Sequence, residues 1–164
     1  MTEAQRLFLT QARSDFAVFE LLRRQRNVSA CHPLHYLQMS TELFGKARAW
    51  RHGPNRTSHR AFVGFLRSLS SNRQAQHRLG YAGRNQNWTH LIRKSIPLAE
   101  RIENLAPALN PDAPNPEYPW PRENPHAAPV EYRFDIWLDL QETSAGRQFL
   151  RFLQGLFASA EVFI

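Results

Sequence analysis

Eight prolines between Pro107 and Pro129 limit what this chain can fold into more than any other feature of its sequence. A proline inside a helix removes a backbone hydrogen bond and clashes with the preceding turn, and central strands exclude it. We therefore predict a rigid, non-helical crossing segment here, with regular structure on both sides. The predicted organisation is a single domain with core helices over about residues 3–109, a proline-rich strap over 110–142 and a C-terminal helix over 143–158.

Apolar residues recur at helical spacing on both sides of the prolines. Spacings of three and four place Phe8, Ala12 and Phe19 on one stripe of a helix over residues 3–26. The same reasoning predicts helices over residues 33–50, 58–69, 88–109 and 143–158. Gly80 and Gly83 argue against one unbroken helix over residues 72–87. We therefore expect a mainly α fold, a four- or five-helix up-and-down bundle with a proline-rich extended segment before the last helix.

Residues 130–140 follow a different pattern, because apolar and polar side chains alternate there with the exception of Trp137. A period of two predicts a β-strand. Since no second strand is evident to pair with it, an extended stretch lying on the surface is the alternative.

Positive charge is concentrated in one block of the chain. The 57 residues from Leu43 to Ala99 hold eleven Arg or Lys and no acidic residue, whereas the rest of the chain holds 10 basic and 14 acidic residues. Such a block suggests a polyanionic partner, most simply RNA or DNA. An ordinary solvated surface, or a patch that answers the chain's own acidic segments, is the alternative. The candidate nucleic-acid-binding residues are Arg51, Arg56, Arg60, Arg67, Arg73, Arg78, Arg93 and Lys94.

Composition also bears on the other functional classes. Cys31 is the only cysteine, so neither an internal disulfide nor a thiolate metal cluster can form. The basic block has no carboxylates to bind Mg²⁺, which argues against a two-metal nuclease, and we expect no metal and no cofactor. The N-terminus lacks the apolar core of a signal peptide, and no apolar run approaches the ~20 residues of a membrane span. We expect a cytoplasmic protein with no membrane partner.

Several motifs in the first three predicted helices resemble one family. They are Arg13-Ser14-Asp15-Phe16, His35-Tyr36-Leu37-Gln38-Met39-Ser40-Thr41-Glu42, Lys46-Ala47 and Ser58-His59-Arg60-Ala61-Phe62. On these motifs, residues 4–109 resemble the HEPN superfamily of small helical bundles. The resemblance implies an up-and-down bundle that commonly dimerises. Many members are metal-independent ribonucleases of toxin–antitoxin or phage-defence systems, and others have lost the catalytic pair and act as binding or scaffold modules. No family feature accounts for residues 110–140.

The resemblance also implies a site, because active members carry an Arg and a His separated by a few residues, often with a polar residue after the Arg. The string from Arg84 through Asn85 to His90 fits, with five residues between the Arg and the His. The candidate catalytic residues are therefore Arg84, Asn85 and His90. A histidine can move protons to and from RNA oxygens, and an arginine can stabilise charge on the phosphorane, with the asparagine orienting. Two copies across a dimer axis would bring two such pairs to one phosphate.

Spacing alone does not establish this pair. With 19 Arg and 7 His in the chain, chance predicts roughly two such matches. Two are present, Arg84 with His90 and Arg26 with His32, and we interpret the second as chance because it straddles a predicted loop. The competing interpretation of the first is that His90 packs or caps at a helix start and Arg84 only adds to the basic face.

The leading hypothesis is an RNA-binding, HEPN-like protein that acts as a metal-independent endoribonuclease of a toxin–antitoxin or phage-defence system. Its expected partners are RNA or another polyanion, a second copy of the chain in a homodimer, and a cognate antitoxin or other protein. The alternative is a catalytically inactive HEPN-like module that binds a partner protein, a nucleotide or nucleic acid. A third hypothesis is a helical interaction protein that docks a neighbour through the proline strap and its aromatic residues.

Overall fold

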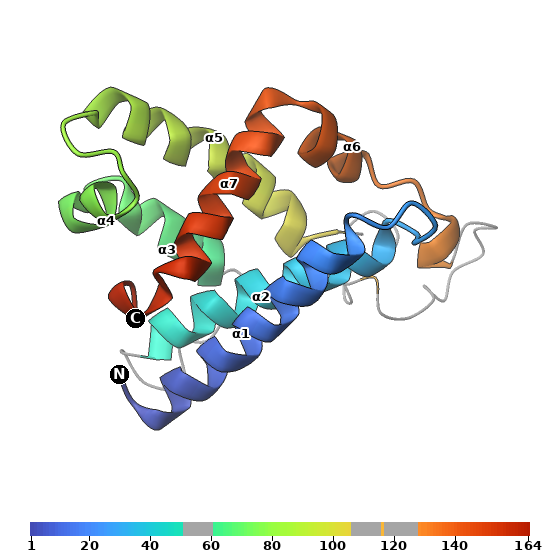
Figure 1. Cartoon of the computed structure of the whole chain (residues 1–164), viewed down its shortest axis with the longest axis horizontal. Helices are drawn as coiled ribbons and strands as arrows, with labels where there is room; N and C mark the ends of the chain where they lie inside the picture. Colours follow the sequence, from blue (N-terminus) through green and yellow to red (C-terminus); the bar gives the residue numbers. More distant parts are fainter. Residues whose placement is uncertain (51–60, 106–115, 117–127) are drawn as a thin grey trace.

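The computed structural model describes residues 1–50, 61–105, 116 and 128–164, and it confirms the mainly helical fold (Figure 1). Four helices are long: α1 (Glu3–Leu22), α2 (Cys31–Ala49), α5 (Asn85–Glu103) and α7 (Ser144–Ala158). Three helices are short: α3 (Ala61–Leu69), α4 (Arg73–Arg78) and α6 (Asp135–Glu142). Single 3₁₀ turns lie at η3 (Pro129–Glu131) and η4 (Ala160–Val162). Buried apolar side chains from all seven α-helices join in one cluster, so the described helices share a core.

Helices α1 and α2 run antiparallel and side by side (Figure 1). A capping box starts α1, because the Thr2 hydroxyl accepts from the Gln5 backbone N–H and the Gln5 side chain accepts from the Thr2 N–H. The amide nitrogen of Gln5 then donates to the carbonyl of Ala47 at 3.1 Å, which ties the start of α1 to the end of α2. The apolar stripe expected on α1 is buried at Ala12, Phe16 and Phe19.

Helix α7 closes the core over this pair. The ring of Phe157 stacks on Phe16 with centroids 4.2 Å apart and meets Phe44 edge-on at 5.3 Å, so one α7 side chain contacts both α1 and α2. Helix α3 comes very close to α2 at Gly45. A Cβ on Gly45 would lie 2.5 Å from the backbone nitrogen of Phe62, so the bare backbone allows this approach.

The strand predicted over residues 130–140 is wrong. The described segment there contains η3 and then helix α6, and the described part of the predicted strap, residues 128–142, is mostly helical rather than extended. Ile136 and Leu140 are both buried and lie four residues apart, a spacing that a helix satisfies as well as an alternating strand does. The described residues contain no strand with which this segment could pair. Residues 110–115 and 117–127 of the strap lie outside the described residues.

The turn between α6 and α7 is tight. The Thr143 hydroxyl caps α7 by accepting from the Gly146 N–H at 2.9 Å. A Cβ on Gly146 would lie 2.0 Å from the carbonyl oxygen of Asp139, so a side chain there has no space. The C-terminal helix is confirmed within one residue of its predicted start.

Candidate functional site

The turn between α4 and α5 sets the geometry of the candidate site. Asn72 starts α4 by accepting from the Ala75 N–H at 2.9 Å. The chain then reverses through Gly80, with φ of +80°, and Gly83, with φ of +69°. These are left-handed conformations that side chains with a Cβ adopt at a cost. In Figure 1 this turn lies at one end of the molecule, far from the loop that joins α1 to α2.

Trp88 anchors the first turns of α5 to the core. Its side chain is 2% exposed, and its indole N–H donates to the carbonyl of Leu69 at 3.0 Å, at the end of α3. The Trp88 ring also packs on Tyr81 at 5.7 Å and on Phe152 of α7 at 6.4 Å. Because this face of α5 is buried, the opposite face of the same turns is directed to solvent.

The exposed face of α5 carries a polar stripe. Gln86, His90 and Arg93 follow one another at spacings of four and three, with Thr89 beside them, so they share a side of the helix. Together with Asn85 these residues line an open hollow of about 420 Å³. The Nδ1 atom of His90 lies 3.4 Å from a terminal guanidinium nitrogen of Arg93. Because a guanidinium can only donate, this contact is a hydrogen bond in the neutral tautomer that carries its proton on Nε2.

Asn85 does two things in this arrangement. Its side-chain oxygen accepts from the amide nitrogen of Gln76 at 2.8 Å, and the same Gln76 nitrogen donates to the carbonyl of Tyr81 at 2.8 Å. Gln76 is only 7% exposed, so this pair of bonds fixes the turn from its inner side. Asn85 therefore lines the hollow and also holds the turn, a structural role that the sequence motif did not indicate.

Arg84 is positioned differently from the other two candidate catalytic residues. It is the exposed N-cap residue of α5, and its backbone accepts from the Trp88 N–H at 3.0 Å. Its side chain is not among those that line the hollow. Within one chain Asn85, His90 and Arg93 thus line one hollow, and Arg84 is not part of that lining. Sequence reasoning placed Arg93 only among the binding residues, although its position three residues after His90 on one helix signals their proximity.

The predicted nucleic-acid-binding residues differ in whether they form an ion pair with a carboxylate. Arg67 pairs with Glu100 at 2.8 Å, and so it belongs to an ordinary surface ion pair. Other cations lie on α4, in the turn after it and on the first half of α5, a stretch (residues 73–94) that we call the α4–α5 end. They are exposed and have no carboxylate of the described residues within ion-pair distance. These unpaired cations are Arg73, Arg78, Arg84, Arg93 and Lys94. The candidates Arg51, Arg56 and Arg60 lie outside the described residues.

A buried carboxyl lies elsewhere, between α1 and α2. Asp15 is 7% exposed, and burial raises the pKa of its carboxyl; the hydrogen bond from Gln11 at 2.8 Å and the nearby His35 act in the opposite direction. The Nδ1 atom of His35 is buried, and no hydrogen-bond partner reaches it from the described residues. This pair belongs to the helix hairpin and not to the surface around α4 and α5.

No family model, curated protein or solved structure matches the chain. Among the described residues, no group of three or more His, Cys, Asp or Glu side chains converges as metal ligands would. Within the same ranges, no helix has both the length and the apolar character needed to cross a membrane.

Proposed function

We propose that this protein binds single-stranded RNA through its α4–α5 end. The observation that carries the proposal is the set of unpaired cations there, one of which, Arg93, lines a hollow together with His90 and three neutral polar side chains. Phosphate binding by exposed arginines is favourable because condensed counterions are released and because the guanidinium fork matches phosphate oxygens. Where an arginine already pairs with a carboxylate, as Arg67 does, the free energy gained by binding phosphate is smaller.

We further propose that the RNA is cleaved without a metal ion, in keeping with the resemblance to HEPN ribonucleases of toxin–antitoxin or phage-defence systems. His90 would take the proton of a 2′-hydroxyl or give one to the leaving oxygen, and Arg93 at 3.4 Å would stabilise the charged phosphorane. One chain supplies one histidine to the hollow, and Arg84 lies outside its lining. A homodimer in which the starts of the two α5 helices face each other would bring a second histidine and both Arg84 side chains to one phosphate.

The test is an incubation of labelled single-stranded RNA with the full chain in EDTA. The chain contains its own matched control, because Arg26 and His32 have the same spacing as Arg84 and His90. Arg26 lies between α1 and α2 and His32 lies in the first turn of α2, and Figure 1 shows this loop at the other end of the molecule from α4. Cleavage that Arg84→Ala and His90→Ala abolish, and that Arg26→Ala and His32→Ala leave intact, supports the proposal. Cleavage that requires Mg²⁺ or survives His90→Ala would refute the catalytic part.

A catalytically inactive module that only binds nucleic acid, a nucleotide or a partner protein is the second candidate. The placement of Arg84 outside the lining of the hollow favours it, since the arginine and the histidine of the sequence motif do not then share one site within a single chain. Salt-dependent RNA binding without cleavage in EDTA would select this candidate. If RNA neither binds nor is cut, a partner protein such as an antitoxin becomes the occupant to test.

A further inference from the structure

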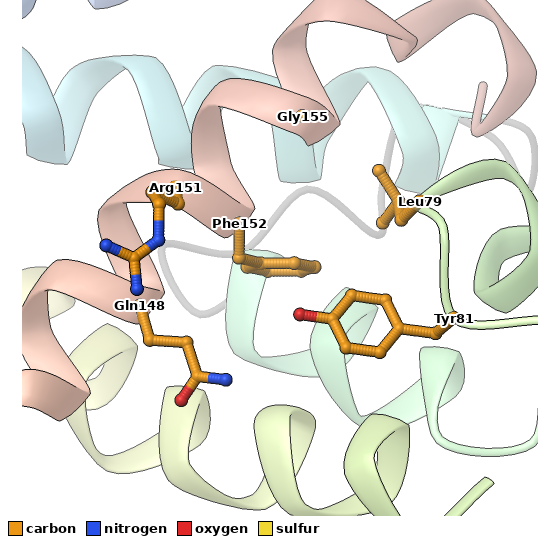
Figure 2. Close-up of a pocket in the computed structure, with 6 residues that line it drawn as sticks. All are labelled: Leu79, Tyr81, Gln148, Arg151, Phe152 and Gly155. Atoms are coloured by element: carbon orange, nitrogen blue, oxygen red, sulfur yellow. The ribbon is translucent and has the colours of Figure 1, made fainter. Parts of the chain in front are cut away.

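A second cavity lies on the other side of the α4–α5 turn, against α7 (Figure 2). It has a volume of about 260 Å³. Its lining residues are Leu79, Tyr81, Gln148, Arg151, Phe152 and Gly155. Gly155 helps to keep it open, because a Cβ at this position would already lie 3.2 Å from the Leu79 side chain.

The lining combines an aromatic floor with a polar rim. Phe152 is 5% exposed and forms part of the floor, and the Tyr81 ring stands opposite it on the turn. Figure 2 shows the Tyr81 hydroxyl pointing from the turn toward the side chains of α7, where the Gln148 amide and the Arg151 guanidinium stand at the rim. None of these three polar groups has a hydrogen-bond partner among the described residues, and no acidic side chain lines the cavity. The cavity thus offers ring faces, an amide and one positive charge.

This cavity and the α5 hollow share one structural support. The Gln76 amide nitrogen donates to the Tyr81 carbonyl and to the Asn85 side-chain oxygen. Tyr81 lines the cavity and Asn85 lines the hollow. The unpaired cations Arg78 and Arg84 belong to the same helix–turn–helix stretch. The two openings therefore border one turn and its unpaired cations.

We infer that the cavity takes one unpaired base of the RNA strand, an inference that depends on the proposed function. The base would lie against the rings of Tyr81 and Phe152, its edge would meet the Gln148 amide, and a neighbouring phosphate would meet Arg151. About 260 Å³ is below the range of ~300–1,000 Å³ typical of pockets that enclose a whole drug-sized ligand, and it suits a single planar ring system. Bases are available in this way only in single strands, loops and bulges, where they can be turned outward.

The experiment is an abasic scan. An unstructured RNA of about eight nucleotides is prepared intact and in versions that each lack one base, and binding to the full chain is followed by fluorescence anisotropy. We expect one or two positions at which loss of the base weakens binding about tenfold, the order that stacking on aromatic side chains contributes. The same scan on Gln148→Ala should show a smaller penalty at those positions, whereas Gln25→Ala, an exposed glutamine after α1, should reproduce the wild-type scan.

The outcomes separate this inference from the proposed function. If the intact RNA does not bind in a salt-dependent manner, the proposed function fails. If it binds but the scan is flat, or if Gln148→Ala changes nothing that Gln25→Ala does not, the base pocket is refuted while RNA binding stands. A free nucleoside monophosphate provides the second arm. Saturation of the cavity by the mononucleotide as tightly as by the strand would assign the cavity to a free nucleotide and overturn its role in strand recognition.

Discussion

Two regions of this molecule treat positive charge in opposite ways. Around α1 and the C-terminus, arginines meet carboxylates: Arg13 pairs with Glu161, and Glu20 accepts from Arg23, Arg24 and the amide of Gln154. Around α4 and the first half of α5, five exposed cations meet no carboxylate of the described residues, namely Arg73, Arg78, Arg84, Arg93 and Lys94, whereas Arg101 near the end of α5 pairs with Asp139. The same residue type thus takes part in intramolecular ion pairs in one region and has no acidic partner among the described residues in the other.

The largest expected effect tests whether the α4–α5 end is rigidly attached to the core. Trp88→Ala removes a buried indole, its contacts with Tyr81 and Phe152, and the hydrogen bond to Leu69. We expect the free energy of unfolding to fall by about 3–5 kcal/mol, measured by urea denaturation. Trp50→Ala is the control, because Trp50 is half-buried and its ring contacts Phe8 of α1. Equal losses for the two variants would mean that Trp88 is no special anchor.

The next effect concerns the region around α1 and the C-terminus, where arginines pair with carboxylates. Glu20→Gln removes the charge that two arginines and Gln154 share, at a side chain that is 17% exposed. We expect unfolding to become easier by about 1–2 kcal/mol, since hydrogen bonds to a partly buried charge contribute more than exposed ion pairs do. Glu131→Gln, at an exposed residue, should stay within about 0.5 kcal/mol of wild type. A Glu20 variant as stable as the Glu131 variant would show that the ion pairs around α1 do not stabilise the fold, and the contrast with the unpaired cations of α4 and α5 would be lost.

A comparable loss is expected in the turn between α4 and α5. Gly83→Ala meets no neighbouring atom, so its cost arises from the positive φ alone and should be about 1–2 kcal/mol. Gly64→Ala is the matched control, because Gly64 lies in α3 with open space around it and alanine favours a helix. We expect the control to raise thermal stability and the turn variant to lower it. The same sign for both would contradict the conformational argument.

The smallest effect is a pH dependence at Asp15. Burial raises the pKa of the Asp15 carboxyl in the folded chain above its value in the unfolded chain. The stability that the protonated carboxyl contributes is therefore fully present below the unfolded-state pKa and is lost as pH rises through the folded-state pKa. Asp15→Asn should therefore be more stable than wild type near neutral pH, and the difference should shrink toward about pH 4. Asp135→Asn, at an exposed surface position, should show no such trend in urea midpoints across this range. A trend of the opposite sign at Asp15 would show that His35 and Gln11 outweigh burial.

The long helices could be predicted from sequence, because their apolar residues recur every three or four positions and tertiary packing uses those same stripes. The region around Ile136 could not, since two buried residues four apart fit both an alternating strand and a helix. The stripe of His90 and Arg93 follows from helical spacing. The hydrogen bond from Gln76 to Asn85 depends on how the glycine turn folds back, and the cavity between Tyr81 and Gln148 depends on how that turn packs against α7. No local sequence pattern predicts either feature.

The most direct test of the central claim asks whether position or net charge governs RNA binding. One triple variant replaces Arg78, Arg93 and Lys94 by glutamine, and a second replaces the paired arginines Arg6, Arg24 and Arg133 and so removes the same charge. Affinity for a short single-stranded RNA is measured from about 50 to 200 mM salt. We predict that the first variant reduces the slope of log affinity against log salt by about two, as the loss of three phosphate contacts requires, and that the second leaves it near wild type. Equal reductions in both variants would contradict an RNA site at the α4–α5 end.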